Sequence, residues 1–405
     1  MHRRIVAALA GTAAALLVAS PAAAAPTWTV VPSVDPVTTE NQLTAVTARS
    51  ASDVWAVGFY QGPNRHDGRI MLAEHWDGTR WSQVTTPNVQ FFDEKLLAVS
   101  GSGTSDVWAV GSTNQTGFAT TNPITAHWDG TAWTIVATPA TTGTAKSILD
   151  AVVDLAPDNV WAAGRSRDGH ALIEHWNGSA WSIVTAPDPV PPAGSAFAGA
   201  TLTGLSATSA SDVWAVGSFS AAHGTVVDSF TLTEHFDGVR WKVVPSPNVA
   251  KPNQFNGARQ VLSAVAARST GDVWAVGWTI DTATGSFLPD KTLIMHWNGT
   301  SWVVVPSPDH ANEEDMLTGV AAVSSGNAWA VGTFTDRSSG FPLDRTQILR
   351  WNGSAWSVVP TPNGGSGDTL LNGTARVPGT TAQGWAVGFN LTGASTSRTF
   401  VLHLG

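Results

Sequence analysis

The sequence predicts an all-β fold: a seven-bladed β-propeller whose blades each contain four antiparallel strands. The first observation is a Val-Trp-Ala-Val-Gly-type pentapeptide that recurs seven times, at spacings of 53, 53, 53, 60, 55 and 56 residues. A repeat of about 50 residues is typical of propellers and stacked-repeat folds. The second observation is an N-terminal segment that matches the one strand missing from the last repeat, as a closed ring requires. The central tryptophans are Trp55, Trp108, Trp161, Trp214, Trp274, Trp329 and Trp385.

Each repeat has the pattern of four short strands. In the first repeat we expect these strands at 43–46, 54–58, 72–76 and 81–84, with turn residues between them. An Asp-Gly or Asn-Gly pair joins the third strand to the fourth in six repeats. Such pairs accept the positive φ angles that a tight, twisted hairpin needs. The pairs are Asp77-Gly78, Asp129-Gly130, Asn177-Gly178, Asp237-Gly238, Asn298-Gly299 and Asn352-Gly353.

The seventh repeat stops after its third strand, which we expect at 401–405. The matching fourth strand lies at the other end of the chain. Residues 28–33, Trp-Thr-Val-Val-Pro-Ser, correspond to 241–246, Trp-Lys-Val-Val-Pro-Ser. We therefore predict that the N-terminal strand completes the last blade and closes the ring.

Residues 1–25 have the composition of a secretory signal peptide. A basic start with Arg3 and Arg4 precedes an apolar run at 5–19, and small residues follow as far as Ala25. The apolar run is too short to span a bilayer, which takes about 20 residues. We expect residues 1–25 to be removed and residues 26–405 to form a single propeller domain. The mature protein is then secreted, without membrane insertion.

The composition excludes several classes of function. The formal charge is −9, and loss of the two positive charges of Arg3 and Arg4 makes it −11. No basic stripe is present, so nucleic acid is not an expected partner. The chain has no Cys, which removes thiol chemistry and thiolate metal sites. A domain of this size can rely on its core instead of disulfides. We expect no cofactor, no metal and a monomer.

The tryptophan strand, the His-Trp-Asp-Gly-type turn and the tryptophan that follows it resemble the repeats of two propeller families. Tectonin-type repeats share the tryptophan strands, and kelch repeats, including the central domain of galactose oxidase, share a glycine that closes the second strand. The resemblance covers residues 27–405. A tectonin-like repeat implies sugar binding, since members of that family are often lectins. Galactose oxidase chemistry is excluded, because it needs a tyrosine crosslinked to cysteine and this chain has only Tyr60 and no Cys.

A histidine recurs on the expected third strand, and Arg350 replaces it in the sixth repeat. This strand lies far from the axis. Copies in adjacent blades are therefore too far apart to share a metal ion, whose ligands lie at about 2 Å. We interpret the histidines as structural and bonded within or between blades. They are His75, His127, His175, His235, His296 and His403.

Glu74, Glu174 and Glu234 directly precede three of these histidines. One interpretation is a repeated Glu/His/Trp sugar site in each blade groove, which would make binding multivalent. The other is a half-buried carboxylate paired with its hairpin. Apolar residues at this position in the other repeats favour the second interpretation.

The extra chain length is concentrated on one face of the predicted propeller. We name this side the loop face: it carries the loops between second and third strands and the connections between blades. The long segments are 61–69, 112–123, 221–228, 279–291, 186–201 and 245–260. Because long loops over a rigid scaffold often form binding sites, we expect the ligand there.

Two sets of side chains on the loop face are candidate ligand-binding residues. Aromatic residues follow the second-strand glycine and would form a stacking platform, or alternatively pack under their own loops. The shortest loop, after the third tryptophan, holds charged residues that would pair with an anionic sugar, or alternatively form a surface cluster. The aromatic set comprises Phe59, Tyr60, Phe219, Trp278, Phe334 and Phe389, and from it we take Tyr60, Trp278, Phe334 and Phe389 as candidates. The charged set comprises Arg165, Arg167, Asp168 and His170.

One inter-blade loop is acidic. His310 and the carboxylates at 313–315 supply ligands of the kind that calcium binds, but their spacing does not match a calcium loop. We expect a solvated acidic loop there.

No nucleophile elbow, zinc-protease helix, P-loop or dinucleotide fingerprint is present, so we assign no catalytic residue. The sequence favours a secreted binding module that recognises extracellular or cell-wall carbohydrate through the loop face. Two alternatives remain open. One is a carbohydrate-active hydrolase or lyase with its site at the axial mouth, and the other is a scaffold that binds a cell-surface protein.

Overall fold

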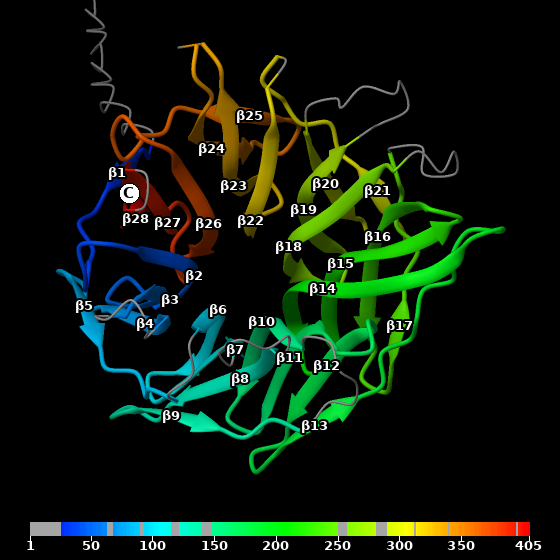
Figure 1. Cartoon of the computed structure of the whole chain (residues 1–405), viewed down its shortest axis with the longest axis horizontal. Coiled ribbons are helices and arrows are strands. Elements are labelled where there is room, and N and C mark those ends of the chain that lie inside the picture. Colours follow the sequence, from blue (N-terminus) through cyan, green and yellow to red (C-terminus); the bar gives the residue numbers. More distant parts are fainter. Residues whose placement is uncertain are drawn as a thin grey trace, which may run out of the picture.

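The computed structural model describes residues 26–405 except for 63–67, 90–92, 115–120, 140–146, 250–256, 281–289, 312, 339 and 394–395. The predicted signal peptide, 1–25, therefore lies outside the described residues. Strands make up all the regular structure of the described part, which contains no helix. The sheets are arranged radially around a central axis, with the two chain ends meeting in one sheet (Figure 1). The protein is an all-β propeller of four-stranded antiparallel blades.

The first units along the chain have the strand bounds that follow. The strands are β2 (Asn41–Ser50), β3 (Asp53–Gln61), β4 (Arg69–Trp76), β5 (Trp81–Val84), β6 (Asp93–Gly103), β7 (Asp106–Asn114), β8 (Thr121–Trp128), β9 (Trp133–Val136), β10 (Ile148–Ala156), β11 (Asn159–Arg165), β12 (Ala171–Trp176) and β13 (Trp181–Val184).

The remaining units repeat the same order, and β1 belongs to the last of them. The strands are β14 (Ala196–Ser209), β15 (Asp212–His223), β16 (Val226–Phe236), β17 (Trp241–Val243), β18 (Arg259–Ser269), β19 (Asp272–Ile280), β20 (Lys291–Trp297), β21 (Trp302–Val304), β22 (Asp315–Ser324), β23 (Asn327–Asp336), β24 (Leu343–Trp351), β25 (Trp356–Val359), β26 (Thr369–Arg376), β27 (Gly384–Gly393), β28 (Thr396–Leu404) and β1 (Trp28–Val30).

In the described part of the chain these strands form five four-stranded sheets and one eight-stranded sheet. The eight-stranded sheet combines β2–β5 with β6–β9. The two groups are joined by a single parallel pair, Arg69 with Asp93. Each group has the same internal order and register as a separate blade.

The prediction that the N-terminal strand completes the last sheet is confirmed. Strand β1 pairs antiparallel with β28, and Trp28 lies opposite Leu404. The resulting order, β1-β28-β27-β26, joins the two ends of the propeller domain.

Each innermost strand carries a β-bulge opposite the glycine of the Val-Trp-Ala-Val-Gly motif. In the first unit the register shifts between Leu43 and Ala45, opposite Gly58. A Cβ atom on Gly58 would lie 2.0 Å from the carbonyl oxygen of Gln42. The motif glycine is therefore required for close strand approach. The same approach, at 1.9–2.0 Å, occurs at Gly111, Gly164, Gly217, Gly277, Gly332 and Gly388.

Tryptophan pairs connect neighbouring units. Each second-strand tryptophan is almost fully buried and meets the outer-strand tryptophan of the next unit edge to face, the geometry that aromatic rings prefer. Ring centroids lie 5.2–6.0 Å apart in these pairs. The pairs are Trp55–Trp133, Trp108–Trp181, Trp161–Trp241, Trp214–Trp302, Trp274–Trp356, Trp329–Trp28 and Trp385–Trp81.

The structural interpretation of the third-strand histidines is confirmed by their contacts. His235 lies 4.5 Å from the ring of Trp214, and its Nε2 atom is 2.7 Å from the Asp212 carboxylate at the start of the second strand. His75, His127 and His296 make the same pair of contacts, and in the β10–β13 unit Asn159 replaces the aspartate. These histidines hold the hairpin turn against the inter-blade core.

Candidate functional site

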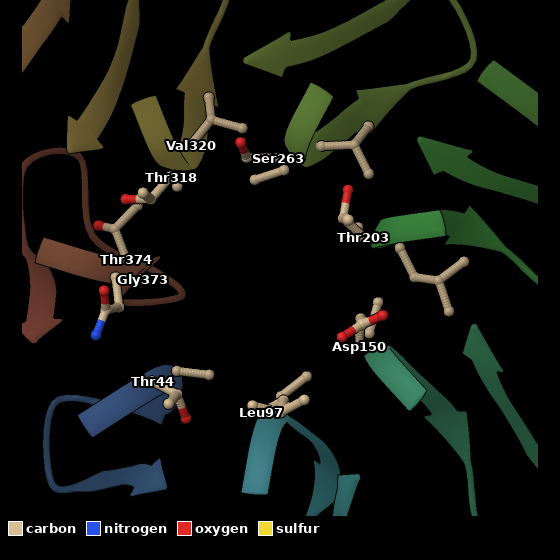
Figure 2. Close-up of a pocket in the computed structure, with 18 of the residues that line it drawn as sticks. Thr44, Leu97, Asp150, Thr203, Ser263, Thr318, Val320, Gly373 and Thr374 are labelled. Carbon is tan, nitrogen blue, oxygen red and sulfur yellow. The ribbon is translucent and has the colours of Figure 1, made fainter. Parts of the chain in front are cut away.

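The innermost strands surround two cavities on the propeller axis, with volumes of about 170 and about 350 Å³. Strands from every unit contribute to the wall of the smaller cavity (Figure 2). Its lining residues lie nearer the loop-face ends of the inner strands than those of the larger cavity do. The wall has mostly small, apolar and hydroxyl side chains. Asp150 supplies the one carboxyl group among the described residues that line this cavity.

The bulge residue of each inner strand lies at the same level of the cavity wall. Most of these residues are hydrogen-bond donors that link neighbouring units. The Thr44 hydroxyl, for example, donates to the carbonyl of Leu96 in the next unit at 2.7 Å. The bulge residues are Thr44, Leu97, Asp150, Thr203, Ser263, Thr318 and Asn372.

Asp150 departs from this pattern. Figure 2 shows it at the cavity wall between Leu97 and Thr203. Burial raises the pKa of the Asp150 carboxyl to about 6, while the positive charge of Arg165 opposes this rise. The Asp150 carboxyl therefore changes its charge close to neutral pH. The side chains at the other bulge positions do not ionise in this range.

On the loop-face side of the residues that line the smaller cavity, each unit has a cross-strand pair at an equivalent position. We name this set the mouth ring. Each pair joins the loop-face end of an inner strand to the residue after the motif glycine. The pairs are Gln42–Phe59, Lys95–Ser112, Ile148–Arg165, Thr201–Ser218, Val261–Trp278, Met316–Thr333 and Leu370–Phe389.

The mouth ring has two chemically different arcs. The apolar arc spans the units from β18 round to β3 and contains Val261, Trp278, Met316, Leu370, Phe389 and Phe59. The polar arc spans β6 to β15, where Lys95 and Arg165 carry positive charge. Phe59 lies at the boundary, with the Lys95 ammonium 5.0 Å and the Arg69 guanidinium 5.3 Å from its ring centroid.

The predicted aromatic residues do not form one platform. Trp278 and Phe389 lie in the mouth ring, on β19 and β27. Tyr60 instead packs against the inter-blade core beside Trp385. Phe334 stacks on His310, with ring centroids 3.7 Å apart. Two of the four candidates thus belong to the mouth ring, and the other two are used in packing elsewhere.

The predicted charged residues separate in a similar way. Arg165 is exposed in the mouth ring, beside Asp150. Arg167 donates to the side chain of Asn122 on β8. Asp168 accepts a hydrogen bond from Ser166, which lowers the pKa of its carboxyl.

His170, the fourth charged candidate, turns toward the next inter-blade connection. Its Nδ1 atom lies 2.7 Å from the Asp188 carboxylate, and its ring stacks on Phe197. The hydrogen bond with Asp188 raises the pKa of His170. Only Arg165 of the charged candidates therefore reaches the mouth ring.

The structure corrects two further expectations about loops. The segment 221–228 is the tip of a continuous hairpin, because β15 extends to His223 and β16 begins at Val226. The predicted solvated acidic loop contains a fully buried carboxylate, Asp315, which bonds His310 at 2.7 Å. Parts of the other long segments, including 63–67, 115–120, 250–256 and 281–289, lie outside the described residues.

Neither interpretation of Glu74, Glu174 and Glu234 was correct. All three side chains are 0% exposed, so they line no open groove. Among described residues, no hydrogen-bond partner reaches either carboxyl oxygen of Glu174 or Glu234. Burial raises the pKa of each of the three carboxyls to about 8, which keeps them protonated at neutral pH.

We expect Glu234→Leu to remove a pH dependence of stability. The pKa of Glu234 rises from 4.5 when unfolded to about 8 when folded, so its contribution is complete below pH 4.5 and is lost as the pH rises through 8. Leucine is the natural residue at this position in another unit, Leu349. In urea unfolding the variant should exceed the wild type in stability at pH 9. Equal pH slopes for the two proteins would contradict the assignment.

Sequence reasoning missed Asp150 and Lys95 as parts of the site. Their signal was present in the aligned repeats: Asp150 stands three residues after a buried Ser147, at a position that holds Thr or Ser in four other repeats. That signal has meaning only once the bulge brings the position to the axis. No group of three or more metal-ligating side chains occurs within the described ranges. A membrane-spanning helix is likewise not found in the part of the chain that the structure describes.

Comparison with known proteins identifies the fold. No family model matches the chain, and no curated protein matches it. The structure titled YCF48 bound to D1 peptide is similar, with TM-score 0.52, 12% identity, and coverage of 93% of this chain and 97% of that one. A GH74 xyloglucanase from Xanthomonas campestris has TM-score 0.53 and 13% identity, over 92% of this chain and 55% of its own. A PL25 ulvan lyase bound to a saccharide has TM-score 0.54 and 10% identity, over 89% and 94%.

Proposed function

We propose that this chain is an exported seven-bladed propeller that binds extracellular carbohydrate at the mouth ring. The observation that carries the proposal is the location of the positions at which the repeats differ in residue type. On the face opposite the loops, the repeated polar groups bond within their own units, as His235 does with Asp212. In the mouth ring, the equivalent positions instead hold residues that differ from unit to unit, among them tryptophan, phenylalanine, arginine and lysine. These residues have no structural role that is repeated in every unit.

The two arcs suit a sugar. The apolar arc offers Trp278 and Phe389, aromatic rings that stack on the apolar face of a pyranose. The polar arc offers Arg165 and Lys95, whose N–H groups donate to hydroxyl or carboxylate oxygens. A concave, mainly apolar site with a few placed polar groups is the usual form of a small-ligand site.

Several parts of this proposal rest on the sequence pattern. Residues 1–25 support secretion and leave 26–405 as the mature domain. The count of seven blades follows if the eight-stranded sheet is divided at its single parallel pair, Arg69 with Asp93. The tectonin-like or kelch-like type and the monomeric state are proposed on the same basis. Two similar solved propellers are described as a xyloglucanase and an ulvan lyase, and both names refer to polysaccharides.

The test is binding of mature protein, starting at Pro26, to a panel of extracellular and cell-wall polysaccharides. We expect at least one ligand, and we expect Trp278→Ala to weaken it by about tenfold or more, which corresponds to about 1.4 kcal/mol. Arg165→Ala should weaken acidic polysaccharides more than neutral ones. The matched control is Val303→Ala, an exposed change on an outer strand, which should leave affinity unchanged.

Other outcomes of the same panel distinguish the alternatives. Shortening of a polysaccharide, detected by a fall in its molecular mass, would identify a hydrolase or lyase. Glycoside hydrolysis ordinarily uses two carboxyl groups, and the described wall of the smaller cavity supplies Asp150. Absence of binding across the panel would leave a scaffold for a cell-surface protein as the better account.

A further inference from the structure

Side chains at the bulge positions link neighbouring units through one repeated hydrogen bond. At four of the seven bulge positions the side chain donates to the carbonyl oxygen of the leucine that precedes the next unit's bulge, and these four are Thr44, Thr203, Thr318 and Asn372. Thr203 donates to Leu262 at 2.6 Å and Thr318 donates to Leu371 at 2.7 Å. The bond does not require a hydroxyl, because Asn372 makes it through its side-chain amide to Leu43, also at 2.7 Å.

Asp150 occupies the same position in β10, and the equivalent acceptor in the next unit is the carbonyl of Leu202. An ionised carboxylate has only acceptors, so it cannot make this bond and faces another acceptor instead. A protonated carboxyl has one O–H donor and can replace the threonine hydroxyl. The repeat therefore assigns Asp150 a hydrogen-bonding role that depends on its proton.

The surroundings of Asp150 contain few charges that would hold the carboxylate form. Arg165 on β11 is the nearest opposing charge, and Lys95 lies at the loop-face end of β6. Strand β14, which carries the acceptor, has no ionisable side chain in its range Ala196–Ser209. Asp154 on the same strand and Asp106 on β7 lie toward the other end of the channel, where both bond Ser102. Burial outweighs the effect of Arg165 and raises the pKa of Asp150 to about 6.

We propose that Asp150 is a proton-dependent link between the β10–β13 and β14–β17 units. With its proton, the carboxyl donates to the carbonyl of Leu202 and adds this unit to the four whose bulge side chains make the inter-unit bond. Without its proton, it leaves that carbonyl without a side-chain donor and turns to Arg165. Because Asp150 lies in the cavity wall and Arg165 in the adjoining mouth ring, the protonation state sets the charge at this end of the cavity. The inference does not depend on the identity of any ligand.

The direction of the pH effect follows from linkage. A carboxyl whose pKa is raised on folding stabilises the folded state fully below its unfolded pKa of 3.8, and this contribution is lost as the pH rises through about 6. A difference of about two units changes the unfolding equilibrium constant by about 50-fold between pH 4 and pH 7. Between pH 4 and pH 7 the wild type should therefore lose stability by this factor, compared with a variant whose side chain is a donor at every pH.

The experiment compares urea unfolding of the wild type with Asp150→Asn from pH 4 to pH 8. Asparagine is the donor that Asn372 uses at the same position, so this variant should resemble the wild type at pH 4 and exceed it by about 50-fold in the equilibrium constant at pH 7. Asp150→Leu, which introduces the residue found naturally at Leu97, is the matched control without a donor. Asp290, whose pKa is also about 6, is present in all three proteins and cancels in the comparison.

Infrared difference spectroscopy supplies a second readout that packing alone does not change. The difference between the wild-type and Asp150→Asn spectra should contain a protonated-carboxyl band at pH 5 that disappears near pH 6. The bands of Glu74, Glu174, Glu234 and Asp290 are common to both proteins and cancel in this difference. If Asp150→Asn fails to fold, Asp150→Thr, which introduces the donor found naturally at Thr203, replaces it. A constant difference between wild type and the donor variant from pH 4 to pH 8, or an ionised Asp150 at pH 5, would overturn the proposal.

Discussion

Gly217→Ala should prevent the protein from folding. A Cβ atom at this position would lie 1.9 Å from the carbonyl oxygen of Thr201 and 2.9 Å from the Cα of Leu202, both part of the neighbouring strand. Neither backbone atom can move without separating β14 from β15. We expect loss of soluble protein or a fall in unfolding free energy above about 4 kcal/mol, which is exceptional for one substitution. Circular dichroism and urea unfolding measure the result.

Gly271→Ala is the matched control. Its Cβ would lie 3.6 Å from the nearest atom, the Cα of Gly299, which is an ordinary contact. Serine or aspartate stands at the equivalent turn position in several other repeats, as at Ser211. We expect a change within about 0.5 kcal/mol. Equal effects of the two alanines would show that the close approach at the bulge is not what requires glycine.

Trp214→Ala should cost about 3–5 kcal/mol of unfolding free energy, the usual range for removal of a buried tryptophan. The Trp214 side chain is 1% exposed. It contacts Trp302 at 5.3 Å, Trp297 at 5.0 Å and His235 at 4.5 Å between ring centroids. Its loss therefore weakens the interface between two units as well as its own sheet. Thermal unfolding followed by tryptophan fluorescence measures the effect.

Trp214→Phe separates volume from aromatic contact, and it should cost less than the alanine variant. Val239→Ala, at a side chain that is 85% exposed in a turn, is the control for a change outside the core. An unchanged melting temperature for Trp214→Ala would contradict the assignment of this residue to the inter-blade core.

Much of the architecture could be predicted because it repeats. The tryptophan spacing indicated equivalent units, and Asp-Gly or Asn-Gly pairs located the third turn of each. The match between 28–33 and 241–246 identified the strand that completes the last sheet, which β1 and β28 confirm. Local patterns sufficed for these features, since each depends on residues close in sequence or on a copied segment.

The axial site could not be predicted in the same way. Which side chain reaches the axis depends on the bulge opposite Gly164, and a bulge changes the alternation of sides along a strand. The alternation rule therefore does not place Asp150 at the cavity. Glu234 shows a similar limit: its neighbours along the chain suggest an exposed hairpin, but the preceding unit covers it completely.

The candidate residues on the loop face separated for a related reason. Adjacent positions on a strand point to opposite faces. A shift of one residue thus decides on which side of the second strand an aromatic ring lies, and therefore which neighbours it contacts. Trp278 follows the motif glycine directly and lies in the mouth ring, whereas Phe334 is one residue further on and stacks on His310. Sequence proximity to the glycine did not resolve this difference.

The central claim is that the mouth ring is the binding surface, and hydrogen–deuterium exchange with a polysaccharide from the panel tests it without choosing residues in advance. We predict slower exchange at the loop-face ends of β11, β19 and β27, which carry Arg165, Trp278 and Phe389. The Asp-Gly and Asn-Gly turns on the opposite face should exchange as in the free protein. Protection confined to those turns or to the outer strands would contradict the account.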